Sequence, residues 1–390
     1  MTGAKREKRR LVAGKGGRPA QRPKSAASAL RGPPEYTAHL ETQNVDTAAE
    51  LLRALVPVGD GWQGAVPEQW EGPHPAPEWW VFRGQADARW GLVASAHRGE
   101  KLREFLRLPG IDQELVERSS TREREWVAVM CFIHECRRSG VPVPEDGQAM
   151  RGMERAIARS LGRDALPDAD DPQEFPPGIL LSNFAIAQHH GVPTRLLDWS
   201  GAPFVSAYFA AESAMLEMSR LEGPPARKVR GHSRLAVWAL LRSDAMTWGA
   251  DAWTTRMGLS GEDLPATFRF VEAPLDSNDR LKAQAGLFTA VHTKTVVPAF
   301  PAPRTNAANE DVAPLERVVG YAHGLAVQKF GQALSRPWLR KITLPWTEAP
   351  ELLRLLSRMN IHAGTVYLGH SGVVRSMSER RWFSRWPGGY

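Results

Sequence analysis

The feature that most constrains the fold is a short apolar run that ends in a charged residue. The run from Trp79 to Phe82 is aromatic and β-branched, a composition typical of a β-strand, and Arg83 and Gly84 follow it directly. Because glycine weakens strands, we expect the strand to end at Gly84, so that Arg83 lies at the end of the strand. The stretch therefore predicts a core strand and, beside it, an arginine that can reach a ligand.

Segments of helical and strand character alternate irregularly along the rest of the chain. We identify them by apolar residues at helical spacing or by short β-branched and aromatic runs. Helices are expected over residues 40–57, 111–138, 182–190, 203–219 and 349–359, and strands over 234–241, 286–291 and 340–345. There is no internal repeat and no regular strand–helix–strand order, so the sequence predicts an α+β fold.

Three residues mark expected helix boundaries. Thr47 precedes Ala48 and Glu50 as the cap of a first helix, Gly191 follows helix 182–190, and Pro203 lies in the first turn of the next helix. Glycine commonly follows a helix because it tolerates the left-handed conformation, and proline fits the first turn because its missing N–H has no helical partner.

Basic residues are concentrated at the N-terminus. The chain has a net charge of +7, yet residues 1–32 contain ten Lys or Arg and one acid, Glu7, a charge of +9 that leaves −2 for the remainder. Such a Gly-, Pro- and Lys/Arg-rich segment buries too little apolar surface to fold, so residues 1–37 are predicted to be a disordered tail. Two roles stay open for it: an arm that binds nucleic acid, or a solubilising extension.

The body of the chain is typical of a globular protein. Its 390 residues are 42% hydrophobic, enough for one large domain or two ordinary ones. We divide the chain into the tail, a helix with a Pro- and Gly-rich loop over residues 38–77, and one main domain over residues 78–390. No apolar stretch approaches the roughly 20 residues that span a bilayer, and no apolar segment follows the basic N-terminus, so no membrane partner is expected.

The two cysteines do not indicate a metal site or a disulfide-bonded fold. Cys131 and Cys136 form neither a zinc-binding pattern nor a disulfide framework. We therefore expect a reducing, cytoplasmic environment and no metal.

Polar residues interrupt the apolar sequence between Ala187 and Glu212. Arg195 and Asp198 flank two leucines, and charges so close to a core must be paired. A structural pair between them is favoured, with Arg83 as the other candidate partner of Asp198. His189 and His190 end a helix, where they can interact with the helix dipole or serve as acid–base groups, but two histidines alone make a poor metal site.

These motifs together resemble the FRG domain family, named for its Phe-Arg-Gly motif. The resemblance rests on Phe82-Arg83-Gly84-Gln85, Trp90, Leu92, Ser95, Arg98, Gln188-His189-His190-Gly191, Pro193 to Trp199, and Ala207 to Ala210. Weaker matches at 280–289 and 339–345 extend it over roughly residues 78–370. Ala94 departs from the pattern, as does the segment 366–373. The main domain is thus expected to be an FRG domain with a C-terminal extension.

A second, weaker resemblance is to ADP-ribosyltransferases. In these enzymes an aromatic-Arg-Gly strand grips the NAD phosphates, a later strand ends in serine, and a last strand carries a glutamate beside the nicotinamide ribose. By this resemblance Arg83, Ser200 and Gln284 are the candidate catalytic residues. Gly84, Gln85, Arg98, His189 and His190, together with Arg83, are the candidate NAD-binding residues. The resemblance implies a mixed, strongly twisted sheet with flanking helices.

The physical chemistry agrees with these roles, with one departure. Arginine suits bidentate phosphate contact, and a serine hydroxyl can bind a ribose hydroxyl or the nicotinamide amide. The reaction needs a carboxylate or dipole beside an oxocarbenium-like centre, and Gln284 is a neutral amide. Glu212 and Glu272 are the alternative carboxylates.

Three functions therefore stay open, one of which is a scaffold with no small-molecule site. Another is an NAD-dependent transferase or NAD-cleaving enzyme, which the resemblance implies is a bacterial toxin or anti-phage protein. The third is a module that binds a nucleotide or nucleic acid without catalysis.

Overall fold

The computed structural model describes one unit of the chain, within Glu35–Tyr390. The described residues are 40–56, 62, 79–98, 100–160, 176, 178–220, 233–242, 266–271, 286–293, 314–330, 337–367 and 369–384. The predicted tail, Gln284 and Glu272 lie outside them.

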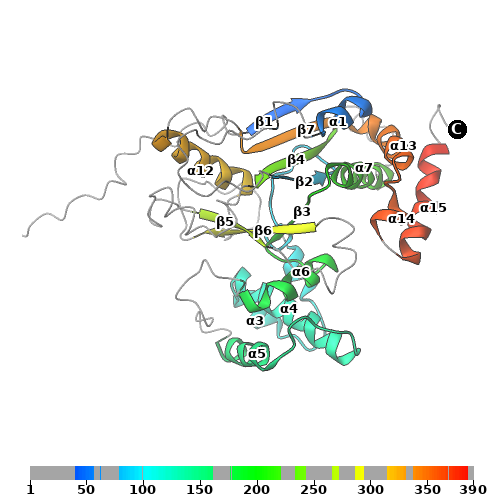
Figure 1. Ribbon diagram of the computed structural model, residues 1–390. Coiled ribbons are helices and arrows are strands. Elements are labelled where there is room, and N and C mark those ends of the chain that lie inside the picture. Colours follow the sequence, from blue (N-terminus) through cyan, green and yellow to red (C-terminus); the bar gives the residue numbers. More distant parts are fainter. Residues whose placement is uncertain are drawn as a thin grey trace, which may run out of the picture. The chain divides into compact units, whose positions relative to one another are not determined.

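A seven-stranded mixed sheet forms the centre of this unit, with the order β1-β7-β4-β2-β3-β6-β5 (Figure 1). The strands are β1 (Leu40–Asn44), β2 (Trp79–Gln85), β3 (Leu196–Ser200), β4 (Arg234–Arg242), β5 (Ala266–Val271), β6 (Gly286–Thr293) and β7 (Leu339–Pro345). β1 and β7 are parallel, and the other neighbours are antiparallel. The α+β fold with a mixed sheet and flanking helices is therefore confirmed.

Helices cover both faces of the sheet. The described helices are α1 (Ala48–Ala54), α2 (Lys101–Phe105), α3 (Gln113–Arg118), α4 (Thr121–Arg138), α5 (Gln148–Ser160), α6 (Leu181–His189), α7 (Pro203–Arg220), α12 (Leu315–Phe330), α13 (Ala349–Arg358), α14 (Ala363–Val366) and α15 (His370–Ser384). Strand β4 explains why both faces need cover. Its seven inner residues are all buried, so successive side chains enter a core on each side.

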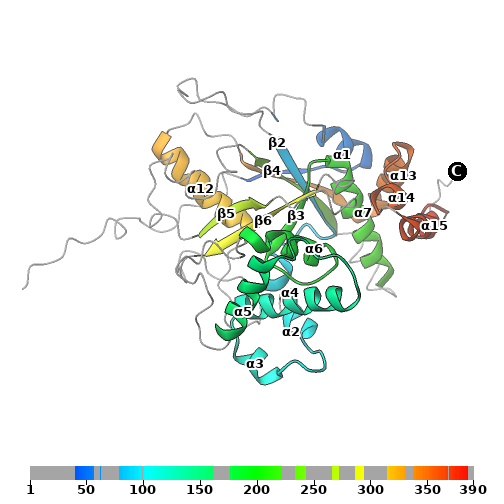
Figure 2. The same cartoon turned by 60° about the horizontal axis from the view of Figure 1, so that its bottom comes forward.

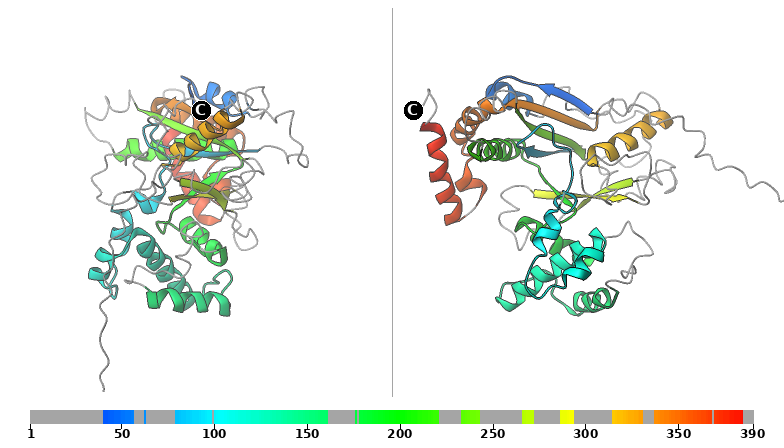
Figure 3. Two further views of the ribbon diagram at one scale, coloured as in Figure 1. Left: turned by 90° about the vertical axis from the view of Figure 1, so that its left-hand side faces the viewer. Right: turned by 180° about the vertical axis from the view of Figure 1, so that it is seen from behind.

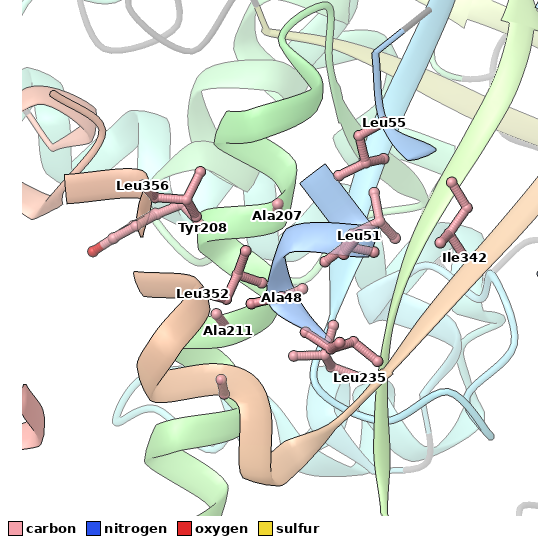
Figure 4. Packing of buried hydrophobic residues seen from close by; sticks show 14 of the residues in the cluster. Ala48, Leu51, Leu55, Ala207, Tyr208, Ala211, Leu235, Ile342, Leu352 and Leu356 are labelled. Carbon is pink, nitrogen blue, oxygen red and sulfur yellow. The ribbon is translucent and has the colours of Figure 1, made fainter. Parts of the chain in front are cut away.

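One core lies between the sheet and helices α1, α7 and α13 (Figure 4). Leu51 of α1, Tyr208 of α7 and Leu352 of α13 meet Leu235 of β4 and Ile342 of β7 there. Buried alanines of α7 allow this helix to approach the strands closely. Helix α7, which begins three residues after β3 ends, is thereby fixed against the centre of the sheet.

Helix α12 covers the opposite face (Figure 3). Its Val318 and Val319 pack with Trp238 of β4 and with Leu197 and Trp199 of β3. A third core joins helices α2 to α6 with β3, β5 and β6, and Figure 2 shows α4, α5 and α6 grouped beside β6. β3 thus contributes to two cores. Leu196 packs in the third core, and Leu197 and Trp199 pack in the core under α12.

Several expected elements are confirmed: strands β4, β6 and β7 and helices α6, α7 and α13 lie where the sequence predicted them. The predicted helix over residues 40–57 is wrong in its first part. Residues Leu40–Asn44 form β1, which gains backbone partners along β7, and the helix begins only after Thr47. Thr47 caps it in a capping box with Glu50, as predicted. Gly191 adopts a φ of 91°, which agrees with its expected place after α6.

The long helix expected over residues 111–138 is two helices. Asp112 caps α3, and Ser120 begins α4 through a capping box with Glu123. Each cap satisfies backbone N–H groups that an uninterrupted helix would have bonded internally, so the chain turns between them.

The expectation that Gly84 ends the first strand is also wrong. β2 continues through Gln85, and Gly84 pairs in register with Val237 of β4. A Cβ atom at Gly84 would lie 2.1 Å from the carbonyl oxygen of Ser206 and 2.6 Å from the backbone nitrogen of Ala210. The glycine is required because α7 packs directly on it, and its assignment as an NAD-binding residue stays a prediction.

The C-terminal helices are joined to α7 by a buried polar cluster. The Tyr208 hydroxyl contacts the carboxylates of Glu212 and Glu379, and Tyr367 donates to Glu212 at 2.6 Å. Arg375 of α15 pairs with Glu212. Burial and the nearby charge of Glu212 raise the pKa of Glu379, so this carboxyl tends to keep its proton.

Candidate functional site

Arg83 and Asp198 form an ion pair across β2 and β3. Arg83 Nη1 donates to the carbonyl oxygen of Asp198 at 2.7 Å and lies 3.3 Å from its carboxylate oxygen Oδ2. The Arg83 side chain is 14% exposed and that of Asp198 is 50% exposed. Of the two partners predicted for Asp198, Arg83 is the correct one. The pair is not fully buried, because its carboxylate side faces solvent.

Arg83 leaves part of its guanidinium without a protein partner. Its Nε is buried and has no hydrogen-bond partner among the residues that the structure describes. The hydrogen bonds that Arg83 makes to Asp198 both use Nη1. A buried donor without an acceptor costs free energy, which an anionic ligand on the Nε side would recover. Arg83 therefore holds Asp198 with Nη1 and keeps a buried donor, Nε, unsatisfied beside the pair.

Gln188 of α6 holds the same carboxylate from the other side. Its Nε2 donates to Asp198 Oδ2 at 3.2 Å, and its Oε1 accepts from the Thr194 hydroxyl at 2.8 Å. The Ser95 hydroxyl, on the short 3₁₀ turn Ser95–His97, lies 3.2 Å from the same Oε1. Thr194 accepts a hydrogen bond from the Leu196 backbone, so its single proton goes to Gln188. These contacts fix the orientation of the amide toward Asp198.

Arg98 contributes a second positive charge. Its Nε donates to the Val93 carbonyl at 2.7 Å. Burial and the neighbouring charge of Arg83 lower the pKa of Arg98 to about 10, an effect that Asp198 partly offsets. The charges of Arg83, Arg98 and Asp198 thus interact, and together they carry a net positive charge that favours an anionic ligand.

The predicted pair between Arg195 and Asp198 is wrong. Arg195 instead binds Glu125 of α4, whose carboxylate accepts from the Arg195 backbone N–H at 2.6 Å and from its Nε at 2.7 Å. The Glu125 side chain is fully buried. Glu125 is 70 residues away in sequence, and only the packing of α4 on β3 brings it to Arg195.

Other predicted site residues have partners of their own. Gln85 is buried, accepts from Trp238 Nε1 at 2.8 Å and donates to the Gly91 carbonyl. The rings of His189 and His190 contact each other, and His190 stacks on Phe132 of α4. No hydrogen bond between these three side chains and Arg83 is present in the described part of the chain. Their assignment as NAD-binding residues stays a prediction.

Ser200 joins the strands on which the transferase resemblance depends. It pairs in register with Phe82 of β2 on one side and with Gly286 of β6 on the other. Its buried hydroxyl accepts from the Ala202 N–H at 3.0 Å, in the turn that leads into α7. The Arg83 strand, the Ser200 strand and the strand that follows Gln284 are therefore neighbours in the sheet.

Sequence reasoning gave Gln188, Ser95 and Thr194 no role, although all three belong to the recognised motifs. A signal was present, since polar residues on both sides of buried segments need hydrogen-bond partners. Their mutual contacts depend on α6 meeting the turn after β2, which spacing along the chain does not reveal.

A comparison with known families identifies the central segment. Residues 78–218 match the model of the FRG domain, which confirms the predicted resemblance to this family for that segment. Neither a curated protein nor a solved structure matches the chain. The matched segment contains Arg83, Arg98, Gln188 and Asp198, and so the entire hydrogen-bonded network.

The family segment does not complete the sheet by itself. Its strands β2 and β3 pair only at Phe82 and Ser200. β2 takes its other neighbour, β4, from beyond residue 218, and β3 takes β6. The site thus lies where two strands of the FRG segment diverge within a larger sheet.

Two absences hold for the part of the chain that the structure describes. No group of three or more His, Cys, Asp or Glu side chains is placed to hold a metal ion. No helix there is long and apolar enough to cross a membrane.

Proposed function

We propose that this protein binds NAD at the Arg83–Asp198 network and transfers its ADP-ribose to an acceptor or to water. The observation that carries the proposal is the buried, unpartnered Nε of Arg83 beside an ion pair that leaves the carboxylate half exposed. Arg98 adds a second cation near the same carboxylate. This charge pattern suits the diphosphate of a dinucleotide.

The strand order supports the transferase part of the proposal. The resemblance assigns the site to three strands, and β2, β3 and β6 are adjacent. In the reaction, the bond between ribose C1′ and the nicotinamide nitrogen breaks, and its electron pair neutralises that nitrogen. The acceptor forms the new bond at C1′ and releases a proton. The protein's part is to hold the phosphates and to stabilise positive charge on the ribose.

Nicotinamide release from NAD by the full chain tests this function, with cell extract supplied as a source of acceptors. Wild type is expected to release nicotinamide. Gln284→Ala is expected to lower turnover with little change in stability, and Gln284→Glu to raise it, a role that rests on the sequence resemblance. The proposal is wrong if wild type neither binds nor consumes NAD under these conditions.

A non-catalytic nucleotide- or nucleic-acid-binding module is the second candidate. It is favoured by the buried Ser200 hydroxyl, which already accepts the Ala202 N–H. The basic segment over residues 1–32 would then add salt-dependent attraction to nucleic acid. Binding of NAD without nicotinamide release, together with a steep loss of nucleic-acid affinity in salt, distinguishes this candidate from the enzyme.

We further propose the setting that the resemblance implies, a bacterial toxin or anti-phage protein. Expression in a bacterial host then slows growth, and Arg83→Lys relieves the effect. Equal growth of cells that express wild type and Arg83→Lys would contradict this setting but would leave the proposed reaction untouched.

A further inference from the structure

The carboxylate of Asp198 has an unused oxygen. Its Oδ2 receives both Arg83 and Gln188, whereas Oδ1 has no hydrogen-bond partner among the described residues. We propose that Asp198 is the carboxylate of this site and that its Oδ1 accepts a hydrogen bond from a ribose hydroxyl of the bound nucleotide. The inference rests on the proposed function, because it places the ribose of that ligand beside the arginines.

The position of Asp198 distinguishes it from the alternative carboxylate of α7. Glu212 is buried and its two oxygens are occupied by Tyr208, Tyr367 and Arg375. Asp198 is half exposed and adjoins the unpartnered Nε of Arg83. Asp198 therefore combines an available oxygen with a neighbouring anion-binding group.

The ligand class follows from the charges. A carboxylate repels phosphate, so Oδ1 requires a neutral donor, and Arg83 and Arg98 require an anion. A nucleotide supplies both, since its ribose hydroxyls lie a few bonds from its phosphate. Carboxylates bind ribose hydroxyls in this way in dinucleotide-binding folds. Inorganic phosphate supplies the anion but no sugar hydroxyl for Asp198.

Gln188 is the positioning residue for Asp198. Thr194 and Ser95 hold its Oε1, so its Nε2 must point at Asp198 Oδ2. With Oδ2 fixed by two donors, the carboxylate cannot rotate to exchange its oxygens without losing hydrogen bonds. Oδ1 thus stays in the orientation that a ligand meets.

The chain offers a closely matched control pair. Arg340 and Glu41, on β7 and β1, have side chains that are 14% and 45% exposed. Arg340 uses both Nε and Nη2 on Glu41, and its guanidinium also lies over the Trp62 ring. The control pair therefore has nearly the same exposure as the site pair but no unoccupied Nε.

The experiment compares AMP with its 2′,3′-dideoxy analogue by calorimetry on the full chain. Wild type is expected to bind AMP about tenfold more tightly, the effect of one hydrogen bond to a charged group. Asp198→Asn is expected to bind both nucleotides alike, and Glu41→Gln to keep the wild-type preference. Gln188→Leu should reduce the preference without abolishing phosphate binding. Thermal melting verifies folding, and Asp198→Ser replaces Asp198→Asn if that variant does not fold.

The outcomes separate this inference from the proposed function. Equal binding of both nucleotides by wild type, or no binding of AMP, overturns the role of Asp198 even if NAD is consumed. A preference that Asp198→Asn retains overturns it too. A preference that depends on Asp198 supports it even if no nicotinamide is ever released, and in that case only the transfer reaction fails.

Discussion

Two arginine–carboxylate pairs meet at β3, and they are built in opposite ways. Glu125 is fully buried and accepts two hydrogen bonds from Arg195, one from its side chain and one from its backbone. Asp198 is half exposed, and its partner Arg83 keeps a buried Nε without an acceptor among the described residues. A closed pair links α4 to the sheet, whereas an open pair has capacity left for a ligand. Ion pairing alone thus does not distinguish the two arginines, whereas the buried, unpartnered Nε of Arg83 does.

The largest effect is expected at the closed pair. Glu125→Ala leaves the Arg195 charge and its backbone N–H without their buried acceptor, so the free energy of unfolding should fall by roughly 3–5 kcal/mol. Urea denaturation measures the fall, and the surface variant Glu135→Ala, on the same helix, is the control. A change below about 1 kcal/mol would mean that Arg195 finds another acceptor and that the contrast between the pairs is overstated.

This contrast also marks what the sequence could predict. Alternating or continuous apolar runs were sufficient for β4, β6 and β7, because such strands carry their own burial pattern. Arg195 and Asp198 are three residues apart and were natural candidates for a pair, yet their true partners come from α4 and β2. β1 was missed because its polar residues gain strand structure from pairing with β7 and not from their own pattern.

The candidate site was predicted in part for the same reason. The motifs contained Arg83, Arg98 and Asp198, and the structure brings these three charges together. The motif residue Gly84 was expected to leave the backbone open to a ligand, and the structure adds that the approach of α7 requires a glycine at this position. Such close contact between a helix and a strand leaves no trace in spacing along one chain.

The next largest effect concerns the open pair and is expected in ligand binding. Arg83→Lys keeps the charge but loses the planar donor edge, so affinity for NAD should fall by about 10- to 100-fold. The thermal midpoint should change little, since an ammonium can still approach Asp198. If Arg83→Lys unfolds the protein while NAD has no effect on either form, Arg83 belongs with Arg195 as a structural residue.

An intermediate effect on stability is expected beside Arg83. Gly84→Ala places a methyl group 2.1 Å from the Ser206 carbonyl oxygen, so α7 must shift. Overpacking of this kind costs about 1–3 kcal/mol, measurable by urea denaturation. Gly152→Ala is the control, because no atom lies within 4 Å of a Cβ there. An unchanged stability in Gly84→Ala would restore the view that its backbone is open to a ligand.

A third carboxyl group, that of Glu379, has a raised pKa because it is buried and lies near the charge of Glu212. Its pKa is raised above the ordinary 4.5, so the folded state holds the proton more tightly than the unfolded state. The stability that this proton contributes is complete below about pH 4.5 and is lost as the pH rises through the pKa of the folded state. Denaturation of wild type and Glu379→Gln across pH should therefore differ in slope in that range, by up to about 1.4 kcal/mol for each step of one in pH. Parallel curves would show that the pKa of Glu379 is the same in the folded and unfolded states.

The smallest effect on stability is expected at Asp198 itself, and it decides the comparison. Asp198 is 50% exposed, so water solvates its carboxylate, and exposed ion pairs contribute about 1 kcal/mol or less. Its removal also leaves Arg83 Nη1 bonded to the Asp198 backbone carbonyl, which does not depend on the side chain. Asp198→Ala should therefore lower the free energy of unfolding by no more than about 1 kcal/mol in urea, well below the loss in Glu125→Ala. A loss of roughly 3–5 kcal/mol would show that Arg83 is as dependent on its partner as Arg195 is, and the open pair would then be structural.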